Sequence, residues 1–175
     1  MRSADGARLM GTVARVVQQF PELEGRTIRV DLVRPGRGVN GLAFSTREPP
    51  TIALNPSPRA APTLAATVAH ELTHLIQWPQ GPVPNGERAC DLYALARCGT
   101  TCVGPPSYLE VPSATRRRWP HWAPLATLLA RRALVERSNG LRRYLQWWEG
   151  RFRDSVSRAE GEFRGFGGVA SGQLY

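Results

Sequence analysis

The sequence predicts an α+β domain followed by a helical extension at the C-terminal end. Strand-like segments are confined to residues 26–55, helical periodicity precedes and follows them, and the last third of the chain is basic and rich in tryptophan. The 175 residues are 42% hydrophobic, which is enough to build a core. We therefore expect one domain over residues 1–112, with residues 113–175 packed on it.

The first half of the chain alternates between the two kinds of periodicity. Apolar residues recur at helical spacing over residues 5–19, and Pro21 stops that helix. Residues 26–34 alternate apolar with charged side chains, which is typical of a half-buried strand. The short runs at 41–46 and 51–55 predict two more strands that could pair as a hairpin.

Two helices are expected next. The first runs from near Pro62 to just before Pro79, because proline suits the first turn of a helix and cannot continue one. The second covers residues 86–98, with Asn85 as its N-cap and Gly99 as its C-terminal cap.

The last third is expected to be irregular at first and helical afterwards. Residues 104–124 contain five prolines, which predicts an irregular segment. Helices are expected at about 124–138, where Asn139-Gly140 stops the first, and at about 141–163. The glycine-rich tail is predicted to have no regular structure.

Charge and composition exclude several classes of protein. The net charge is +9, carried entirely by arginine: residues 1–112 hold 11 Arg and 9 acids (+2), residues 113–175 hold 12 Arg and 5 acids (+7). No apolar run approaches the roughly 20 residues that span a bilayer, and the N-terminal segment lacks an export signal. We expect a cytoplasmic protein without membrane association. Three cysteines argue against a disulfide framework.

The segment "AHELTH" points to chemistry. His70 and His74 are four residues apart, so on a helix they share one face and could bind one metal ion. Glu71 is rotated by about 100° from His70, where it could act as a general base beside the metal. The alternative is that both histidines have only structural roles, but a helical, apolar-faced segment preceded by strands favours a zinc site.

A catalytic zinc needs a third protein ligand and an open position. Glu87 begins the helix after a short connector, and Asp91 follows one turn later, placed to accept the N–H of a ligating histidine. Glu87 could instead serve only the helix macrodipole. His121 is the one other histidine that could complete the site.

The pair of motifs "HELTH" and "GERACD" resembles the gluzincin zinc metallopeptidases, over roughly residues 1–110, and among them the small single-domain minigluzincins. The resemblance implies a zincin-like fold, with a small twisted mixed sheet, an active-site helix and a glutamate helix. It implies Zn²⁺ bound by His70, His74 and Glu87, Glu71 as general base and Asp91 as partner of His70. The implied activity is hydrolysis of peptide bonds by an endopeptidase.

The resemblance also implies an edge strand that binds peptide substrate in extended form. Our candidate comprises Gly41, Leu42, Ala43 and Phe44, with Gly41 allowing close approach of a substrate backbone. Tyr108 and His121 are candidate oxyanion donors.

The basic end allows other functions. Four of the five tryptophans lie among arginines in residues 116–124 and 141–153, a pattern that also suits single-stranded nucleic acid. A zinc-containing nucleic-acid-binding module, or a protease resembling the DNA-associated SprT-like enzymes with His121 as third ligand, is the alternative. Packing of the tryptophans on the domain explains the pattern better. The C-terminal segment could also block the cleft, through Glu160, Glu162, His121, a cysteine or the terminal carboxylate.

Overall fold

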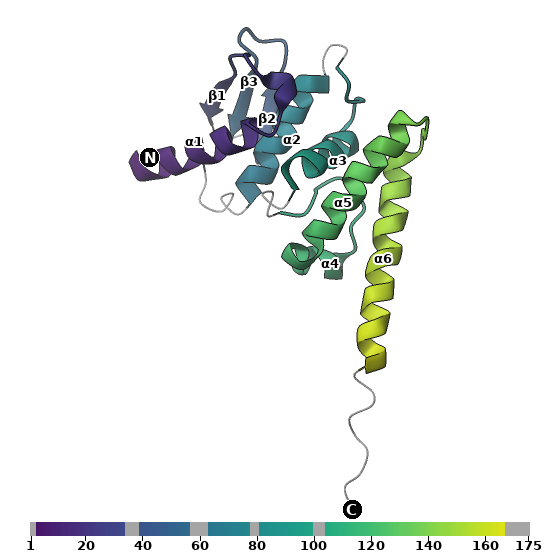
Figure 1. The fold of residues 1–175 in the computed structure, drawn as a ribbon. Helices are drawn as coiled ribbons and strands as arrows, with labels where there is room; N and C mark the ends of the chain where they lie inside the picture. The colour runs from purple at the N-terminus through teal and green to yellow at the C-terminus, as the bar shows by residue number, and fades with distance from the viewer. Residues whose placement is uncertain (1–2, 34–38, 57–62, 78–80, 100–103, 167–175) are drawn as a thin grey trace, which may run out of the picture.

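The computed structural model describes residues 3–33, 39–56, 63–77, 81–99 and 104–166. This part of the chain contains six α-helices and one three-stranded sheet, so the α+β prediction is confirmed. Figure 1 shows the sheet and α1 on one side of the molecule, α2 and α3 in the middle, and α5 and α6 on the other side. Residues 167–175 of the glycine-rich tail and Cys102, one of the three cysteines, lie outside the described residues.

The sheet is small and mixed, as predicted. It consists of β1 (Arg29–Leu32), β2 (Gly41–Phe44) and β3 (Thr51–Leu54) in the order β1-β3-β2. β1 runs parallel to β3, whereas β2 is antiparallel to β3 with Gly41 opposite Leu54, which confirms the hairpin. β2 is therefore an edge strand of this sheet.

One hydrophobic cluster joins the sheet to the first helices. It contains apolar residues from α1 (Ser3–Val17), β3, α2 (Leu64–Gln77) and one face of α3 (Glu87–Cys98). β3 is buried along its whole length, so the central strand is covered on both faces. The cluster holds α2 against the sheet, which places the predicted histidine pair beside β2.

The start of α3 corrects one prediction. The N-cap is Gly86 rather than Asn85, and no side chain caps this end of the helix. Gly86 has φ 112°, a conformation that glycine adopts without steric cost. The chain needs this conformation to turn from the connector into α3, and that need outweighs the capping preference of asparagine. Gly99 caps the C-terminal end as predicted.

The segment predicted to be irregular is partly helical. It contains α4 (Ser113–Arg117) and the first turns of α5 (Trp119–Ser138), which begins about five residues earlier than expected. Pro120 is tolerated in the first turn, and burial of Trp119 and Trp122 outweighs the hydrogen bond that Pro124 cannot donate. α6 (Tyr144–Phe166) follows after the predicted break at Asn139 and Gly140.

A second hydrophobic cluster lies between α3, α5 and α6. Leu92 and Leu95 of α3 pack there with Trp119, Trp148 and further apolar residues of the extension. α3 therefore contributes to both clusters, and residues between 119 and 159 of the extension complete the burial of a helix that belongs to the first part of the chain.

Glu149 ties the extension to the start of α3. Its carboxylate is 4% exposed, and Oε2 lies 2.5 Å from Nη2 of Arg88. Glu149 Oε1 also accepts a hydrogen bond from the Glu110 backbone N–H at 3.0 Å. This ion pair, which is buried at its Glu149 end, joins α6 to the residue that follows Glu87.

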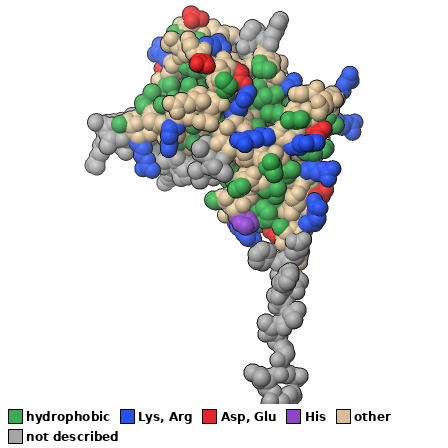
Figure 2. Space-filling model, in the orientation of Figure 1, with side chains coloured by type: hydrophobic (Ala, Val, Ile, Leu, Met, Phe, Trp, Pro, Cys, Tyr) green, Lys and Arg blue, Asp and Glu red, His purple; other side chains and the backbone are tan. Residues whose placement is uncertain are grey.

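The surface of the extension is basic but mixed. Figure 2 shows arginine side chains scattered over the α5–α6 side of the molecule, between hydrophobic ones, without forming one continuous patch. Within the described residues, no helix combines the length and apolar character that a membrane-spanning segment requires.

Candidate metal centre

The two histidines of α2 project side by side toward the start of α3. Their rings are 4.9 Å apart between centroids and nearly perpendicular. Oε2 of Glu87 lies 2.8 Å from Nε2 of His70 and 3.3 Å from Nε2 of His74. The structure therefore brings together the three residues that the sequence predicts as metal ligands.

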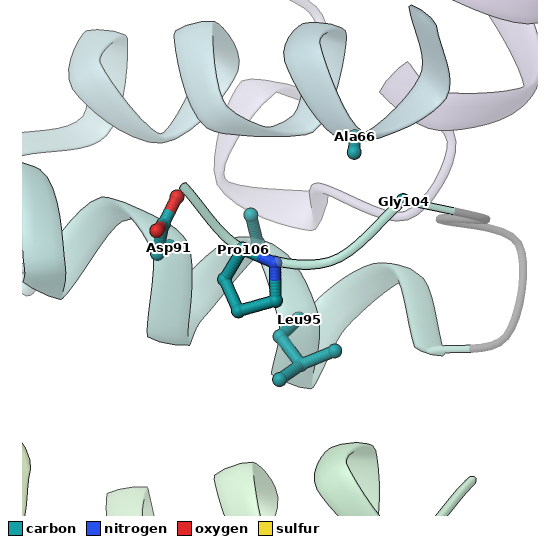
Figure 3. Close-up of a pocket in the computed structure, with 6 residues that line it drawn as sticks. Ala66, Asp91, Leu95, Gly104 and Pro106 are labelled. Carbon is teal, nitrogen blue, oxygen red and sulfur yellow. The ribbon is translucent and has the colours of Figure 1, made fainter. Parts of the chain in front are cut away.

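Asp91 holds the other nitrogen of His70. Its Oδ1 lies 2.8 Å from Nδ1, and its Oδ2 accepts hydrogen bonds from the backbone N–H groups of Tyr108 and Leu109. Figure 3 shows Asp91 on α3 beside the segment from Gly104 to Pro106, which closes a small cavity between α2 and α3. Asp91 is thus enclosed, and it orients His70 and the loop that carries Tyr108.

The protonation of His70 follows from this partner. Burial lowers the pKa of His70, but the hydrogen bond and charge of Asp91, together with the charge of Glu71, outweigh burial and raise the pKa above its ordinary value. The Asp91 carboxylate only accepts hydrogen bonds, so Nδ1 carries a hydrogen. In the neutral ring, Nε2 then has a free lone pair directed toward Glu87.

His74 has two further neighbours, which the sequence did not reveal. Nδ1 lies 2.9 Å from Oε1 of Gln77 and 3.2 Å from Sγ of Cys90. His70, His74 and Cys90 offer ligand atoms within 4.8 Å of one another, so these three residues could hold a metal ion. Burial, and then the charges of Glu87 and Asp91, raise the pKa of the Cys90 thiol far above neutrality, so the sulfur is protonated in the metal-free protein.

Two ligand sets are therefore available, one completed by Cys90 and one completed by Glu87. Ligand atoms about 2.0–2.1 Å from a tetrahedral zinc lie roughly 3.3 Å apart. The distance from Glu87 Oε2 to His74 Nε2, 3.3 Å, equals that spacing, whereas the distance to His70 Nε2, 2.8 Å, is that of a hydrogen bond. Carboxylate and imidazole ligands with one open position are typical of catalytic zinc sites.

Glu71 lies beside this set without joining it. Burial raises its pKa to about 7, the charge of Glu87 adds to the rise, and His70 opposes it. Gly41 of β2 packs directly on the carboxylate: a Cβ at this position would lie 2.7 Å from Oε1 of Glu71 and 2.8 Å from Cγ2 of Thr67. A glycine at position 41 therefore leaves room for the Glu71 side chain, a role that the sequence did not reveal.

An open cleft separates β2 from the two histidines. Leu42 and Ala43 line it from the sheet, and Tyr108 and Asn85 line it from the loops. The Tyr108 ring stacks on His70 at 5.5 Å between centroids. Partial burial and the nearby carboxylates raise the pKa of the Tyr108 hydroxyl, so it keeps its proton at neutral pH. Phe44 is not among the lining residues, and its ring lies under Arg47.

The structure does not bring His121 to the cleft. It lies near the start of α5, where its ring contacts Trp122, so neither a third-ligand nor an oxyanion role is supported. The carboxylate of Glu160 faces Arg118 instead of the histidines. Trp119, Trp122 and Trp148 are buried, which supports packing as their role rather than base stacking.

The sequence analysis did not identify Gln77 and Cys90 as neighbours of His74, although the spacing of Gln77 from His74 could have indicated its contact. Gln77 follows His74 by three residues, a spacing that places neighbouring side chains on one helix face. Cys90 lies one turn after Glu87, but the sequence could not show which way its thiol points relative to His74.

Comparisons with protein-family models, with curated proteins and with solved structures found no match to this chain.

Proposed function

We propose that this protein is a zinc-dependent endopeptidase. The observation that carries the proposal is the convergence of His70 Nε2, His74 Nε2 and Glu87 Oε2 beside a buried carboxylate, on a cleft whose opposite wall is a sheet edge. This combination favours a catalytic over a structural metal site, because a purely structural site requires neither a base nor an open cleft.

His70, His74 and Glu87 would hold the zinc, and Asp91 keeps His70 in the orientation that ligation requires. Bound zinc supplies a Lewis acid that polarises the scissile carbonyl and lowers the pKa of water toward neutrality. The ordinary preference of zinc for imidazole and carboxylate ligands supports this metal over calcium or magnesium.

Glu71 is the proposed general base and, afterwards, the general acid. One carboxylate oxygen accepts a proton from the attacking water while the new C–O bond forms. The same oxygen then delivers that proton to the amide nitrogen as the C–N bond breaks. In the metal-free protein, burial raises the pKa of Glu71 to about 7; a bound cation would lower this pKa and so favour the carboxylate form that accepts the proton.

β2 is the proposed binding edge for the substrate. An extended peptide can add to the free edge of the strand through main-chain hydrogen bonds, beside Gly41 and Ala43. The Tyr108 hydroxyl is the remaining candidate donor to the oxyanion, since it lines the cleft and keeps its proton. The α+β arrangement, with a histidine helix beside an edge strand, supports a zincin-like fold.

The test combines metal analysis with hydrolysis of fluorescence-quenched peptides. We expect about one zinc per chain in the wild type, loss of zinc in Glu87→Ala, and retained zinc without hydrolysis in Glu71→Gln. Glu110→Gln is the matched control, because Glu110 is an exposed carboxylate that does not line the cleft. Full activity of Glu71→Gln, or a wild type that binds no zinc, would contradict the proposal.

A further inference from the structure

The side-chain amide of Gln77 is held in one orientation by the connector before α3. Its Nε2 lies 2.5 Å from the Pro84 carbonyl oxygen and 3.3 Å from the Gly86 carbonyl oxygen. Carbonyl oxygens only accept hydrogen bonds, so the group that faces them must be the NH₂ of the amide. Oε1 of Gln77 consequently faces the other way, toward His74.

This orientation decides the tautomer of His74. Oε1 of Gln77 lies 2.9 Å from Nδ1 and can only accept a hydrogen bond. A hydrogen on Nδ1 satisfies this shorter contact, and in the neutral ring it leaves the lone pair on Nε2. That is the nitrogen that lies 3.3 Å from Glu87 Oε2.

The same contact bears on the choice between the two ligand sets. Cys90 Sγ lies 3.2 Å from Nδ1, the nitrogen that Gln77 occupies. A metal shared by Cys90 and His74 through that near nitrogen would require Nδ1 without its hydrogen and without Gln77. A metal shared by Glu87 and His74 uses Nε2 and leaves the Gln77 contact intact.

Gln77 also fixes the residue that precedes Glu87. The Gln77 side chain is buried, and its amide NH₂ donates two hydrogen bonds that hold the carbonyl groups of Pro84 and Gly86. The Pro82 carbonyl in the same connector accepts hydrogen bonds from Tyr93 and Arg137. The connector thus reaches Glu87 along an anchored path, and one anchor is the residue that orients His74.

We propose that Gln77 is a positioning residue that holds His74 as the Nδ1–H tautomer, aims Nε2 at the metal, and so selects Glu87 over Cys90 as the third ligand. The proposal deepens the metal site of the proposed function and rests on it, but it does not depend on peptidase activity. Asp91 performs the corresponding task for His70, so each histidine has its own oxygen acceptor at Nδ1.

The first test is made on metal-free protein labelled with ¹⁵N-histidine, at a pH of about 8.5, roughly two units above the ordinary pKa of histidine. Long-range ¹H–¹⁵N spectra report the tautomer of each ring, and the chain has only three histidines to assign. We expect the Nδ1–H form for His74 in the wild type and in Cys90→Ala, and loss of that form in Gln77→Met.

The second test replaces zinc with Co²⁺, whose absorption reports thiolate ligation. We expect no thiolate-to-cobalt charge-transfer band in the wild type and a Co²⁺ affinity unchanged in Cys90→Ala. Gln77→Met should bind Co²⁺ about 10–100-fold more weakly, the usual effect of losing such a partner. Any cobalt that it retains should show the thiolate band.

A thiolate band in the wild type, or an Nε2–H tautomer of His74 in the wild type, would overturn the proposal, and neither result depends on whether a variant folds. An unchanged tautomer and Co²⁺ affinity in Gln77→Met would overturn it as well. Failure of the proposed function looks different. A protein with the expected tautomer and cobalt spectrum that cleaves no peptide would refute the peptidase and leave the role of Gln77 standing.

Discussion

Replacing Arg88 with methionine should destabilise the protein more than replacing its partner Glu149 with glutamine. The two side chains differ in burial: Glu149 is 4% exposed, whereas Arg88 is 37% exposed. Without Arg88, the Glu149 carboxylate stays buried with only the Glu110 backbone N–H as a partner. Without the charge of Glu149, the Arg88 guanidinium can still be solvated.

The expected magnitudes follow from this difference. Removing one partner of a buried ion pair costs about 3–5 kcal/mol when the other charge stays buried. One hydrogen bond remains to Glu149, so we expect about 3 kcal/mol for Arg88→Met. Glu149→Gln loses only the charge assistance of two hydrogen bonds, about 1 kcal/mol. For a chain of this size these values correspond to roughly 6–12 °C and 2–4 °C in Tm.

Urea unfolding, followed by the fluorescence of the buried tryptophans, measures both variants. The double variant Arg88→Met/Glu149→Leu should be more stable than Arg88→Met alone, since it removes the buried Glu149 carboxylate that has lost its cationic partner. Arg153→Met is the control, because its ion pair with Glu110 is exposed on both sides and should cost about 0–0.5 kcal/mol. A cost for Glu149→Gln equal to that for Arg88→Met would refute the argument from burial.

Three further predictions concern the metal centre. Zinc added to metal-free protein at about 100 times its Kd should stabilise the fold by about 2.7 kcal/mol; thermal unfolding should show this shift in the wild type and a much smaller one in Glu87→Ala. In metal-free protein the raised pKa of Glu71, about 7, contributes stability that is complete below the ordinary pKa of the group and is lost as pH rises through 7. The free energy of unfolding of Glu71→Gln, relative to that of the wild type, should therefore rise by roughly 3 kcal/mol from about pH 5 to about pH 8.5. Unfolding free energies that change in parallel with pH in the two proteins would contradict this. Gly41→Ala should cost about 1–3 kcal/mol, because the new methyl group meets Glu71 and Thr67; Leu42→Ala, at a 42% exposed neighbour, should stay within about 0.5 kcal/mol, and equal costs would exclude the clash.

Local patterns were sufficient to predict most elements and the three candidate metal ligands of the centre. The histidine spacing on α2 and the position of Glu87 at the start of α3 depend only on helix periodicity and turn chemistry. The hairpin of β2 and β3 was predictable for the same reason, because its strands are close in sequence. Such features need no knowledge of distant contacts.

The features that were missed depend on contacts between distant residues. α5 begins early because Trp119 is buried against Phe152, which no local pattern in the proline-rich segment indicates. The sequence suggested that Gly41 makes room for a substrate backbone. In the structure its neighbour is the side chain of Glu71, thirty residues further along the chain. The ion pair between Arg88 and Glu149 spans 61 residues. Periodicity identifies a buried face and does not identify what covers it.

The two-sided packing of α3 has a mechanical consequence for the metal centre. Side-chain atoms lie about 5–6 Å from the axis of a helix, and ligand distances in a metal site are held to about ±0.2 Å. A rotation of α3 by roughly 2° about its axis would therefore use up the whole tolerance at Glu87. Leu92 and Leu95 of the same helix lie in the cluster with α5 and α6. No described residue of the extension lines the cleft. Its packing against α3 nevertheless fixes the rotation of α3 about its axis, and with it the position of the Glu87 carboxylate.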